Sequence, residues 1–579
     1  MSHKIAPALF FAAAFLAACG NDSTGNNPPP NLSCGQVTPT SLAPGEAHVF
    51  DPTALTACVA VPSVPAAGTG GAEYLYLAAG TAGQEVSPAL TAQYAIAGGS
   101  LAGASADQAP LPSPLVSAFK PQLTATQFHA MLRQRERAMS TDPTRLAFRA
   151  AKLQAAAATV PPPAIGDVKS FQVCRNSNCD PPFVTVTATA QHVGAKVAIF
   201  VDNSSTLTQK YSSTELQNVG NLFDNFLYPI DTTNFGRESD IDGNGVVYIL
   251  LTPQVNRLSG NCNSSQSVIL GFFFSADLEP GDQGSNAAEI FYSIVPDPTN
   301  TACTISKSFA LDILPPTFIH EFQHMISYGQ HALLRHGSSE DNWLNEGLSH
   351  YAEELGGRLI PDAQNPTLGR SPNSLTQFAF TDYDVSYRYL TNPEALALPQ
   401  TDDGVASLQG GPNFLMVRWL GGQFGTTTAD PSQFLVKATD FTLKLERTSL
   451  VGSANVSQQS GQPFDSLVVY WQLANYLDDL PGFAPATARL TYPDINLRSI
   501  FAQLHQADAS TYPRAYPLLP DSTLTGWYQR AGTLRQATGH HVRIIQAPGA
   551  AGVSFLLTGQ GGAPIASNIV PRIGLVRIR

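Results

Sequence analysis

Long apolar runs are scarce in this 579-residue sequence, and so are charged residues. After residue 18 no stretch reaches the roughly eighteen uninterrupted apolar residues of a membrane-spanning helix. Only 13% of residues are charged, and the net charge is −12, which argues against general binding to nucleic acid or to anionic lipid. Hydrophobic residues make up 43% of the chain, so it can bury a large core, and its length predicts two to four domains.

Cysteine pairs with the spacing of a zinc site are also absent. None of the seven cysteines forms a Cys-x-x-Cys pair, so a cysteine-based zinc site is not expected. Setting Cys19 aside leaves an even number, which favours disulfides in an exported chain. Proximity in the sequence suggests the pairs Cys34 with Cys58, Cys174 with Cys179, and Cys262 with Cys303.

The first residues are typical of a lipoprotein signal. Lys4 precedes an apolar run, and Leu16-Ala17-Ala18-Cys19 resembles a bacterial lipobox. Cleavage before Cys19 would leave that cysteine to carry lipid, so the mature chain would be anchored to a membrane rather than span it. We therefore expect a signal peptide over 1–18 and a lipidated cysteine with a flexible tether over 19–32. The predicted location is the cell envelope, with Gly20 favouring the outer membrane; a secreted chain with an ordinary signal peptide is the alternative.

The segment His320-Glu321-Phe322-Gln323-His324 carries a His-Glu-x-x-His motif. Apolar residues recur around it at helical spacing, which predicts a buried helix from Pro316 to Gly329. Because the two histidines are four residues apart on this helix, their rings share one face and can share a metal. Glu321 could approach a water near that metal and act as a general base. A helix with two satisfied histidines and a surface glutamate is the alternative.

A second helix is expected from Asp341 or Asn342 to Gly356-Gly357, and it carries Glu346 beside its apolar stripe. A carboxylate buried there needs a partner of opposite charge, which zinc would supply. Three protein ligands would leave a fourth position for water, as in catalytic zinc sites. His350, one turn further, is the alternative third ligand. The metzincin pattern is rejected, because its Gly and third His fall on Ser327 and Gln330.

The motif and the later segment Trp343-Leu344-Asn345-Glu346-Gly347-Leu348-Ser349 resemble the hyicolysin family of gluzincin metallopeptidases. The resemblance implies that His320, His324 and Glu346 bind Zn²⁺ and that Glu321 is the catalytic base. The downstream glutamate is also similar to its counterpart in the thermolysin and alanyl aminopeptidase families. No Gly-x-Met-Glu-Asn exopeptidase motif lies upstream, so an endopeptidase is favoured.

The predicted fold class is α+β. A gluzincin-type metallopeptidase core over 164–505, with a mixed β-sheet and an α-rich half, is expected between small β-sandwich-like domains at 33–118 and 506–579. Residues 119–163 predict a helical connector whose basic residues, Arg133 among them, form a solvated face. A pro-segment boundary at the connector is the alternative.

Three smaller features bear on function. Asp240, Asp242 and Asn244 fit the start of a Ca²⁺ loop, but Leu251 stands where the closing Glu belongs, so a tight turn into strand 246–251 is favoured. Strand 289–294 is a candidate edge strand for pairing with substrate, an internal strand being equally compatible. The donor that stabilises the oxyanion is left open among four residues. These are Tyr383, Tyr387, Tyr389 and His350.

The sequence therefore predicts an extracytoplasmic zinc endopeptidase with protein or peptide substrates and a membrane anchor at Cys19. The alternative is a surface lipoprotein that binds protein or glycan and has an inactive peptidase-like core. An intact Glu321 argues against it, because a binding protein has no need of the base. Hydrolysis of a non-protein amide, such as a peptidoglycan cross-link, would use the same zinc chemistry.

Overall fold

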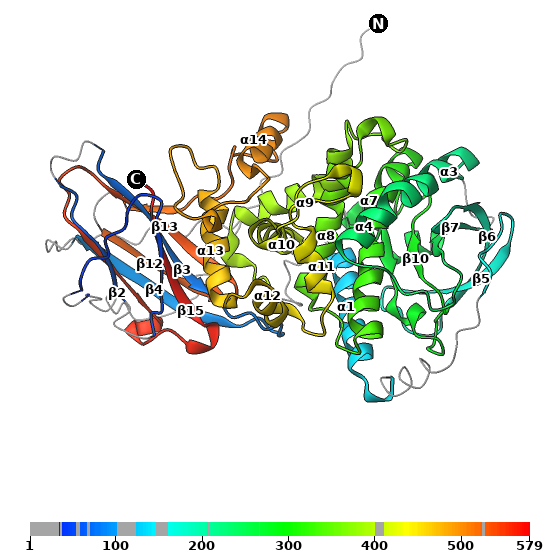
Figure 1. The fold of residues 1–579 in the computed structure, drawn as a ribbon, viewed down its shortest axis with the longest axis horizontal. Helices are drawn as coiled ribbons and strands as arrows, with labels where there is room; N and C mark the ends of the chain where they lie inside the picture. Colours follow the sequence, from blue (N-terminus) through cyan, green and yellow to red (C-terminus); the bar gives the residue numbers. More distant parts are fainter. Residues whose placement is uncertain are drawn as a thin grey trace, which may run out of the picture.

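The chain folds as an α+β protein, as the sequence predicts. The computed structural model describes residues 34, 37–53, 58–65, 70–100, 123–145, 160–204, 209–265, 267–399, 410–523 and 527–579. The expectations for 1–32, including the lipid on Cys19, lie outside this part of the chain. No helix within these ranges is both long and apolar enough to cross a membrane. Figure 1 shows a β-sandwich at the left, helices in the middle and a mixed sheet at the right.

A six-stranded mixed sheet supports the helix that carries the motif. The strand order is β5-β6-β7-β8-β10-β9, with β7, β8 and β10 parallel and the other pairs antiparallel. All residues of β8 are buried, which explains its unbroken apolar sequence. The strands are β5 (Val168–Val173), β6 (Val184–Val193), β7 (Val197–Asp202), β8 (Val247–Leu251), β9 (Gly271–Phe273) and β10 (Ile290–Ser293).

The sheet ends at β9, and not at the strand predicted for 289–294. β10 pairs with β8 on one side and with β9 on the other, so it is internal. Its four residues are all buried, as the alternative of an internal strand requires. β9 has only three residues, which is too short for its sequence pattern to distinguish an edge strand from a loop.

Helix α7 (Lys307–Tyr328) carries the motif and begins well before the predicted start at Pro316. Ser306 caps it by accepting a hydrogen bond from the Phe309 backbone N–H at 3.1 Å. Pro315 and Pro316 therefore lie inside the helix. Pro316 has no N–H to donate to the Asp312 carbonyl, which instead accepts a hydrogen bond from Gln377 Nε2 at 2.9 Å. This replacement partner offsets part of the cost of a proline within a helix.

Helix α8 (Asn342–Leu359) carries Glu346 and begins where the sequence predicts, with Asp341 at its N-cap. It ends two residues beyond the predicted Gly357. Helix α10 (Gly410–Phe424) packs closely on α8 at Gly347. The other helices of this half are α9 (Ser374–Leu390), α11 (Thr439–Glu446), α12 (Gly452–Ser460), α13 (Phe464–Leu477) and α14 (Leu497–Ala507). Those nearer the mixed sheet are α1 (Leu123–Thr141), α3 (Ser213–Leu222), α4 (Tyr228–Asn234), α5 (Pro253–Leu258) and α6 (Cys262–Ser265).

The two ends of the chain form one β-sandwich, which corrects the prediction of separate N- and C-terminal β domains. The sheet orders are β1-β15-β3-β13-β11 and β12-β4-β14-β2, so β3 and β4 each lie between two C-terminal strands. The N-terminal strands are β1 (Ala47–Phe50), β2 (Cys58–Val61), β3 (Ala72–Gly80) and β4 (Thr91–Ser100). The C-terminal strands are β11 (Asp521–Thr523), β12 (Trp527–Arg535), β13 (Thr538–Gln546), β14 (Val553–Thr558) and β15 (Pro571–Arg577).

Strand β3 is buried on both faces, and this joins the sandwich to the helices. Tyr74 and Tyr76 lie in the core between the two sheets. Leu75 and Leu77 point the other way, into the large core that the helices share with the mixed sheet. Helix α13 contacts β3, β13 and β15. The sandwich is therefore packed against the α-rich half through its five-stranded sheet.

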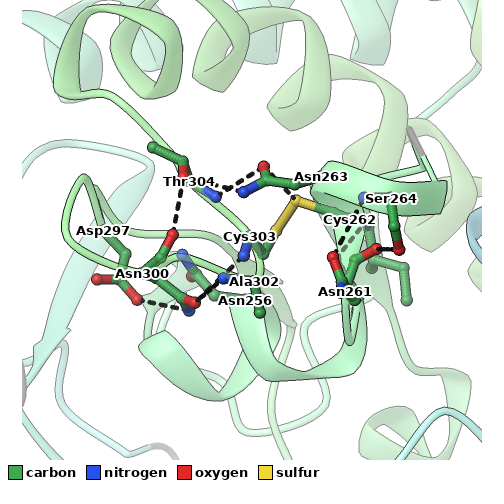
Figure 2. Close-up of a disulfide and its surroundings, with 12 residues drawn as sticks. Asn256, Asn261, Cys262, Asn263, Ser264, Asp297, Asn300, Ala302, Cys303 and Thr304 are labelled. Carbon is green, nitrogen blue, oxygen red and sulfur yellow. Dashed lines mark hydrogen bonds between the residues drawn. A yellow bond between two sulfur atoms is a disulfide. The ribbon is translucent and has the colours of Figure 1, made fainter.

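Three disulfides join the cysteines in the pairs suggested by sequence proximity, namely 34 with 58, 174 with 179, and 262 with 303. Figure 2 shows the third, which ties α6 to the segment leading into α7. Beside it, Asn263 Nδ2 donates to Thr304 Oγ1 at 3.1 Å, and the Thr304 N–H donates to Asn263 Oδ1 at 3.2 Å. The approach to the motif helix is thus braced covalently and by hydrogen bonds.

Candidate active site

The three predicted ligands, His320, His324 and Glu346, come together in the structure. The two Nε2 atoms lie 3.1 Å apart. Glu346 brings one carboxylate oxygen to 3.6 Å from His320 Nε2 and the other to 3.7 Å from His324 Nε2. Helix α7 places both rings on one face, and α8 packs across that face with Glu346 toward them. The arrangement follows from the spacing of four residues on one helix and the close crossing of the second.

Each histidine is held by its other ring nitrogen. His320 Nδ1 is 2.8 Å from Glu353 Oε1, and His324 Nδ1 is 2.7 Å from Asn345 Oδ1. An acceptor at Nδ1 places the proton there and leaves the lone pair on Nε2. Both lone pairs therefore face the space shared with Glu346.

This donor set fits a divalent transition metal. Glu346 Oε1 is buried and has no hydrogen-bond partner among the described residues, so a cation would satisfy it. Two imidazole nitrogens and one carboxylate oxygen are ligands that zinc prefers. A second group, His320, His350 and Glu353, also has its polar atoms within 4.8 Å of one another. There, however, both histidines already contact the Glu353 carboxylate, at 2.8 and 3.2 Å.

Without a metal, a proton occupies part of this site. Burial opposes charge on His320, but hydrogen bonds with Glu346 and Glu353 outweigh it and raise the pKa of His320 to about 10. Burial holds the pKa of His324 well below its usual value. Burial also opposes charge on Glu346, yet the two neighbouring imidazoles hold the pKa of its carboxyl well below the usual range. We take His320 as the ring that carries the proton, which a metal ion would replace.

Glu321, the predicted general base, faces the same cleft from α7. Its Oε2 accepts a hydrogen bond from the Phe273 backbone N–H of β9 at 2.8 Å. Burial raises the pKa of Glu321 above its usual value, against the opposing charges of His320 and Arg133. A carboxylate with a raised pKa accepts a proton more readily, which suits a base that works near neutral pH.

One wall of the cleft comes from α1, a contribution that the sequence analysis missed. The cleft encloses about 320 Å³, and Ala125, Thr126, His129 and Ala130 line it beside His320 and Glu346. Figure 1 shows α1 in cyan, and this helix contacts α8. The spacing of these four residues is that of one helical face. Small and polar side chains give that face little apolar periodicity, so the sequence signal was weak.

Arg133 of α1 is buried, and not on a solvated face as the sequence analysis expected. It is 3% exposed, and its guanidinium lies 3.0 Å from Glu136 Oε1. Its Nη2 also donates to the Phe273 carbonyl at 3.5 Å. Phe273 thus has both of its outward backbone groups engaged, the N–H by Glu321 and the carbonyl by Arg133. A buried arginine is expected where an acidic partner and a carbonyl compensate its charge.

The sequence is similar to a known metalloprotease. Over 143 residues, 24% of this chain, it is 30% identical to the neutral metalloprotease ShpI of Staphylococcus hyicus. The match spans 31% of that protein's length. No protein-family model matches the chain. The similarity suggests a metallopeptidase at this coarse level, in agreement with the His and Glu groups that could hold a metal.

The structure distinguishes His350 from the three tyrosines considered as oxyanion donors by their position relative to the cleft. His350 lines the cleft. The tyrosines belong to α9, which lines the cleft with other residues, namely Gln377, Phe378, Thr381 and Val385. The hydroxyl of Tyr387 bonds to the Arg514 backbone, and that of Tyr389 accepts from Gln472. The ring of Tyr383 packs edge-on against Phe414. Of the four candidates, His350 alone is placed to face a substrate.

The predicted calcium loop lies before β8, and none of its residues lines the cleft. Its turn is closed by the Gly245 N–H, which donates to Asp240 Oδ1 at 3.2 Å. Asn244 Nδ2 donates to Asp242 Oδ2 at 2.7 Å and to the Tyr248 hydroxyl at 2.9 Å. Asn244 thus orients Asp242, while Glu289 joins the two aspartates in a group with metal-ligand spacing.

Proposed function

We propose that this chain is a zinc-dependent endopeptidase of the gluzincin type, exported and anchored through lipid on Cys19. The convergence of two Nε2 lone pairs and a buried, unpartnered oxygen of Glu346 beside Glu321 carries the proposal. The partial similarity to a neutral metalloprotease supports the reaction class. Three disulfides support an oxidising compartment. The lipid anchor rests on the lipobox alone.

Each catalytic task has a residue in the cleft. When held by His320, His324 and Glu346, zinc would acidify a water molecule and polarise the scissile carbonyl. Glu321 takes the proton from the attacking water and delivers it to the leaving amine. The Phe273 N–H orients the Glu321 carboxylate for both transfers.

His350 is our candidate for stabilising the negative charge that develops on the carbonyl oxygen. Its Nδ1 lies 2.8 Å from Asp382 Oδ1 and 3.2 Å from Glu353 Oε1. Burial opposes its charge, but these two carboxylates raise the pKa of His350 well above its usual value. These contacts favour the imidazolium form of the ring, and a charged donor in a partly buried cleft stabilises an oxyanion strongly.

Substrate would lie along β9 as an extended peptide, because this strand is the sheet edge next to Glu321. Val268, Leu270 and Gly271 line the cleft at its start. The N–H and carbonyl of Phe273 are already engaged by Glu321 and Arg133, so a substrate strand would pair with β9 ahead of Phe273, at Gly271.

Cleavage of unfolded casein by residues 33–579 tests the proposal. We expect the wild-type protein to cut casein, a chelator to stop it, and Glu321→Gln to lose activity while it keeps one zinc per chain by elemental analysis. Glu394→Gln, which alters a His–Glu pair in the sandwich, is the control for general damage. Equal cleavage by Glu321→Gln refutes the assigned base. If the wild-type protein binds zinc stoichiometrically and still cuts nothing, the binding-only alternative replaces this proposal.

The anchor needs a separate measurement. Mass spectrometry of the full chain recovered from bacterial envelopes should show an N-terminal Cys19 carrying lipid. An unmodified N-terminus or a cut at another residue contradicts the anchor and leaves the peptidase proposal standing.

A further inference from the structure

A carboxylate that is distant in the sequence completes the loop at 240–245. The sequence pattern of this loop supplies Asp240 and Asp242 but has Leu251 where a calcium loop closes with Glu. In the structure Glu289, which directly precedes β10, is the third member: one oxygen from each of the three residues lies within 4.8 Å of the others. The missing ligand of the local pattern is thus provided by the neighbouring parallel strand.

Glu289 has the properties of a ligand without its ion. It is 2% exposed, so water does not compensate its charge. Its Oε1 accepts hydrogen bonds from Ser239 Oγ at 2.7 Å and from the Ile241 N–H at 2.9 Å, which wraps the loop around it. Its Oε2 is buried and has no hydrogen-bond partner among the described residues. A buried, unpartnered carboxylate oxygen is costly unless a cation satisfies it.

No side chain in the described part of the chain supplies that cation through a salt bridge. Among the described residues, no salt bridge within 4.0 Å involves Asp240, Asp242 or Glu289. Lys169 of β5 acts on Asp242 from a distance, but its ammonium lies over the Tyr248 ring, 4.6 Å from the centroid. Burial raises the pKa of Glu289 to about 7, as expected for a carboxyl group that lacks a counter-charge.

We propose that Asp240, Asp242 and Glu289 bind a calcium ion. The donors are all carboxylate oxygens, two of them on a glycine-containing turn and the third on Glu289, a set that suits a hard cation such as calcium. Asn244 holds Asp242 through its amide and is not a ligand here, which revises the set expected from the sequence.

The ion would connect the catalytic core at two places. It joins the start of β8 to the start of β10, two adjacent parallel strands. It also secures Ser239, which packs against Gly329, the residue directly after α7. The Ser239 backbone nitrogen lies 3.4 Å from the point that a Cβ on Gly329 would occupy. Calcium is therefore expected to stabilise the sheet and the C-terminal end of the motif helix, without contact with the cleft.

Calcium titration of residues 33–579 tests this proposal, using a Glu321→Gln background to prevent self-cleavage. The protein is freed of metal on a chelating resin and reloaded with one equivalent of zinc. Isothermal titration with CaCl2 should show one site, and the melting temperature should rise with calcium concentration. Asp242→Asn and Glu289→Gln should each weaken binding roughly tenfold or more. Asp479→Asn, which removes an exposed carboxylate elsewhere, should leave binding unchanged.

The melting temperatures distinguish a lost ligand from a damaged fold. Glu289→Gln removes a buried charge, so without calcium it should melt no lower than the background protein and should fall below it only when calcium is added. If Glu289→Gln misfolds, the half-buried Asp242→Asn still decides the question. No calcium-dependent rise at millimolar CaCl2, or equal binding by Asp242→Asn, overturns the proposal. Because the readout is binding and melting, either result is independent of peptidase activity.

Discussion

Replacing Glu353 tests whether the groups behind the histidines set the metal affinity. Glu353 Oε1 holds His320 Nδ1 at 2.8 Å, and the glutamate side chain is only 11% exposed, so solvent screens the contact little. Loss of such a partner behind a metal-bound histidine costs about tenfold to a hundredfold in affinity, or roughly 1.4–2.7 kcal/mol. Glu353→Gln keeps an acceptor and loses the charge, so we expect about tenfold. Glu353→Ala leaves His320 Nδ1 without an acceptor, so we expect about a hundredfold.

The assay is competition for zinc between the metal-free protein and a chromophoric chelator at neutral pH. Glu394→Gln serves as the matched control, because Glu394 contacts His540 Nδ1 of the sandwich at 2.6 Å and the variant alters a similar pair that does not line the cleft. Its zinc affinity should equal that of the wild-type protein. Wild-type zinc affinity in both Glu353 variants would refute the role assigned to this contact. Equal losses in Glu353→Gln and Glu394→Gln would point to general destabilisation instead.

Three further predictions follow from the packing and the charges. The pKa of His320 is raised to about 10, so zinc must displace a proton from its ring. Zinc affinity should therefore fall by about tenfold per pH unit as the pH is lowered from 8 to 6. An affinity that does not change with pH in the chelator competition contradicts this prediction. Gly347→Ala should lose about 1–3 kcal/mol in urea unfolding, because the added Cβ would meet the Asn413 carbonyl at 2.7 Å, whereas Gly70→Ala, which meets nothing within 4 Å, should cost far less. Deletion of 33–163 should give an insoluble chain, because it takes β3 and β4 from between their C-terminal partners; a soluble 164–579 fragment with sandwich strands by circular dichroism is the contrary result.

The pro-segment alternative has to be restated in view of the sandwich. β3 and β4 pair with C-terminal strands along nine residues each, so the N-terminal segment is not a separable module. Removing it as a block would take away β3, whose Tyr74 and Tyr76 pack in the core of the sandwich and whose Leu75 and Leu77 pack in the core shared with the helices. In the described part of the N-terminal segment, α1 is the helix whose removal would uncover the cleft, to which it contributes His129.

Features encoded within a few residues of each other were determined by the sequence alone. The four-residue spacing of His320 and His324 on a helix and the start of α8 at Asn342 depend on local geometry. The disulfide partners could be chosen by proximity in the sequence, although their separations reach 41 residues. Glu346 could be proposed because a carboxylate beside an apolar helical stripe requires a compensating charge. The gathering of His320, His324 and Glu346 could therefore be predicted from about forty residues.

Features that depend on which distant segments meet were decided only by the tertiary structure. A strand's alternation shows which faces it buries but not its neighbours, so the pairing of β3 with β13 and the edge position of β9 were not predictable. No local sequence pattern pointed to Glu353 or Arg133, since each has its role through a contact with another element. Glu289 is the clearest case. The loop at 240–245 looked incomplete because its closing carboxylate, on Glu289, comes from the next strand of the sheet. The loop and Glu289 are brought together by burial of the whole hydrophobic core, which no local pattern encodes.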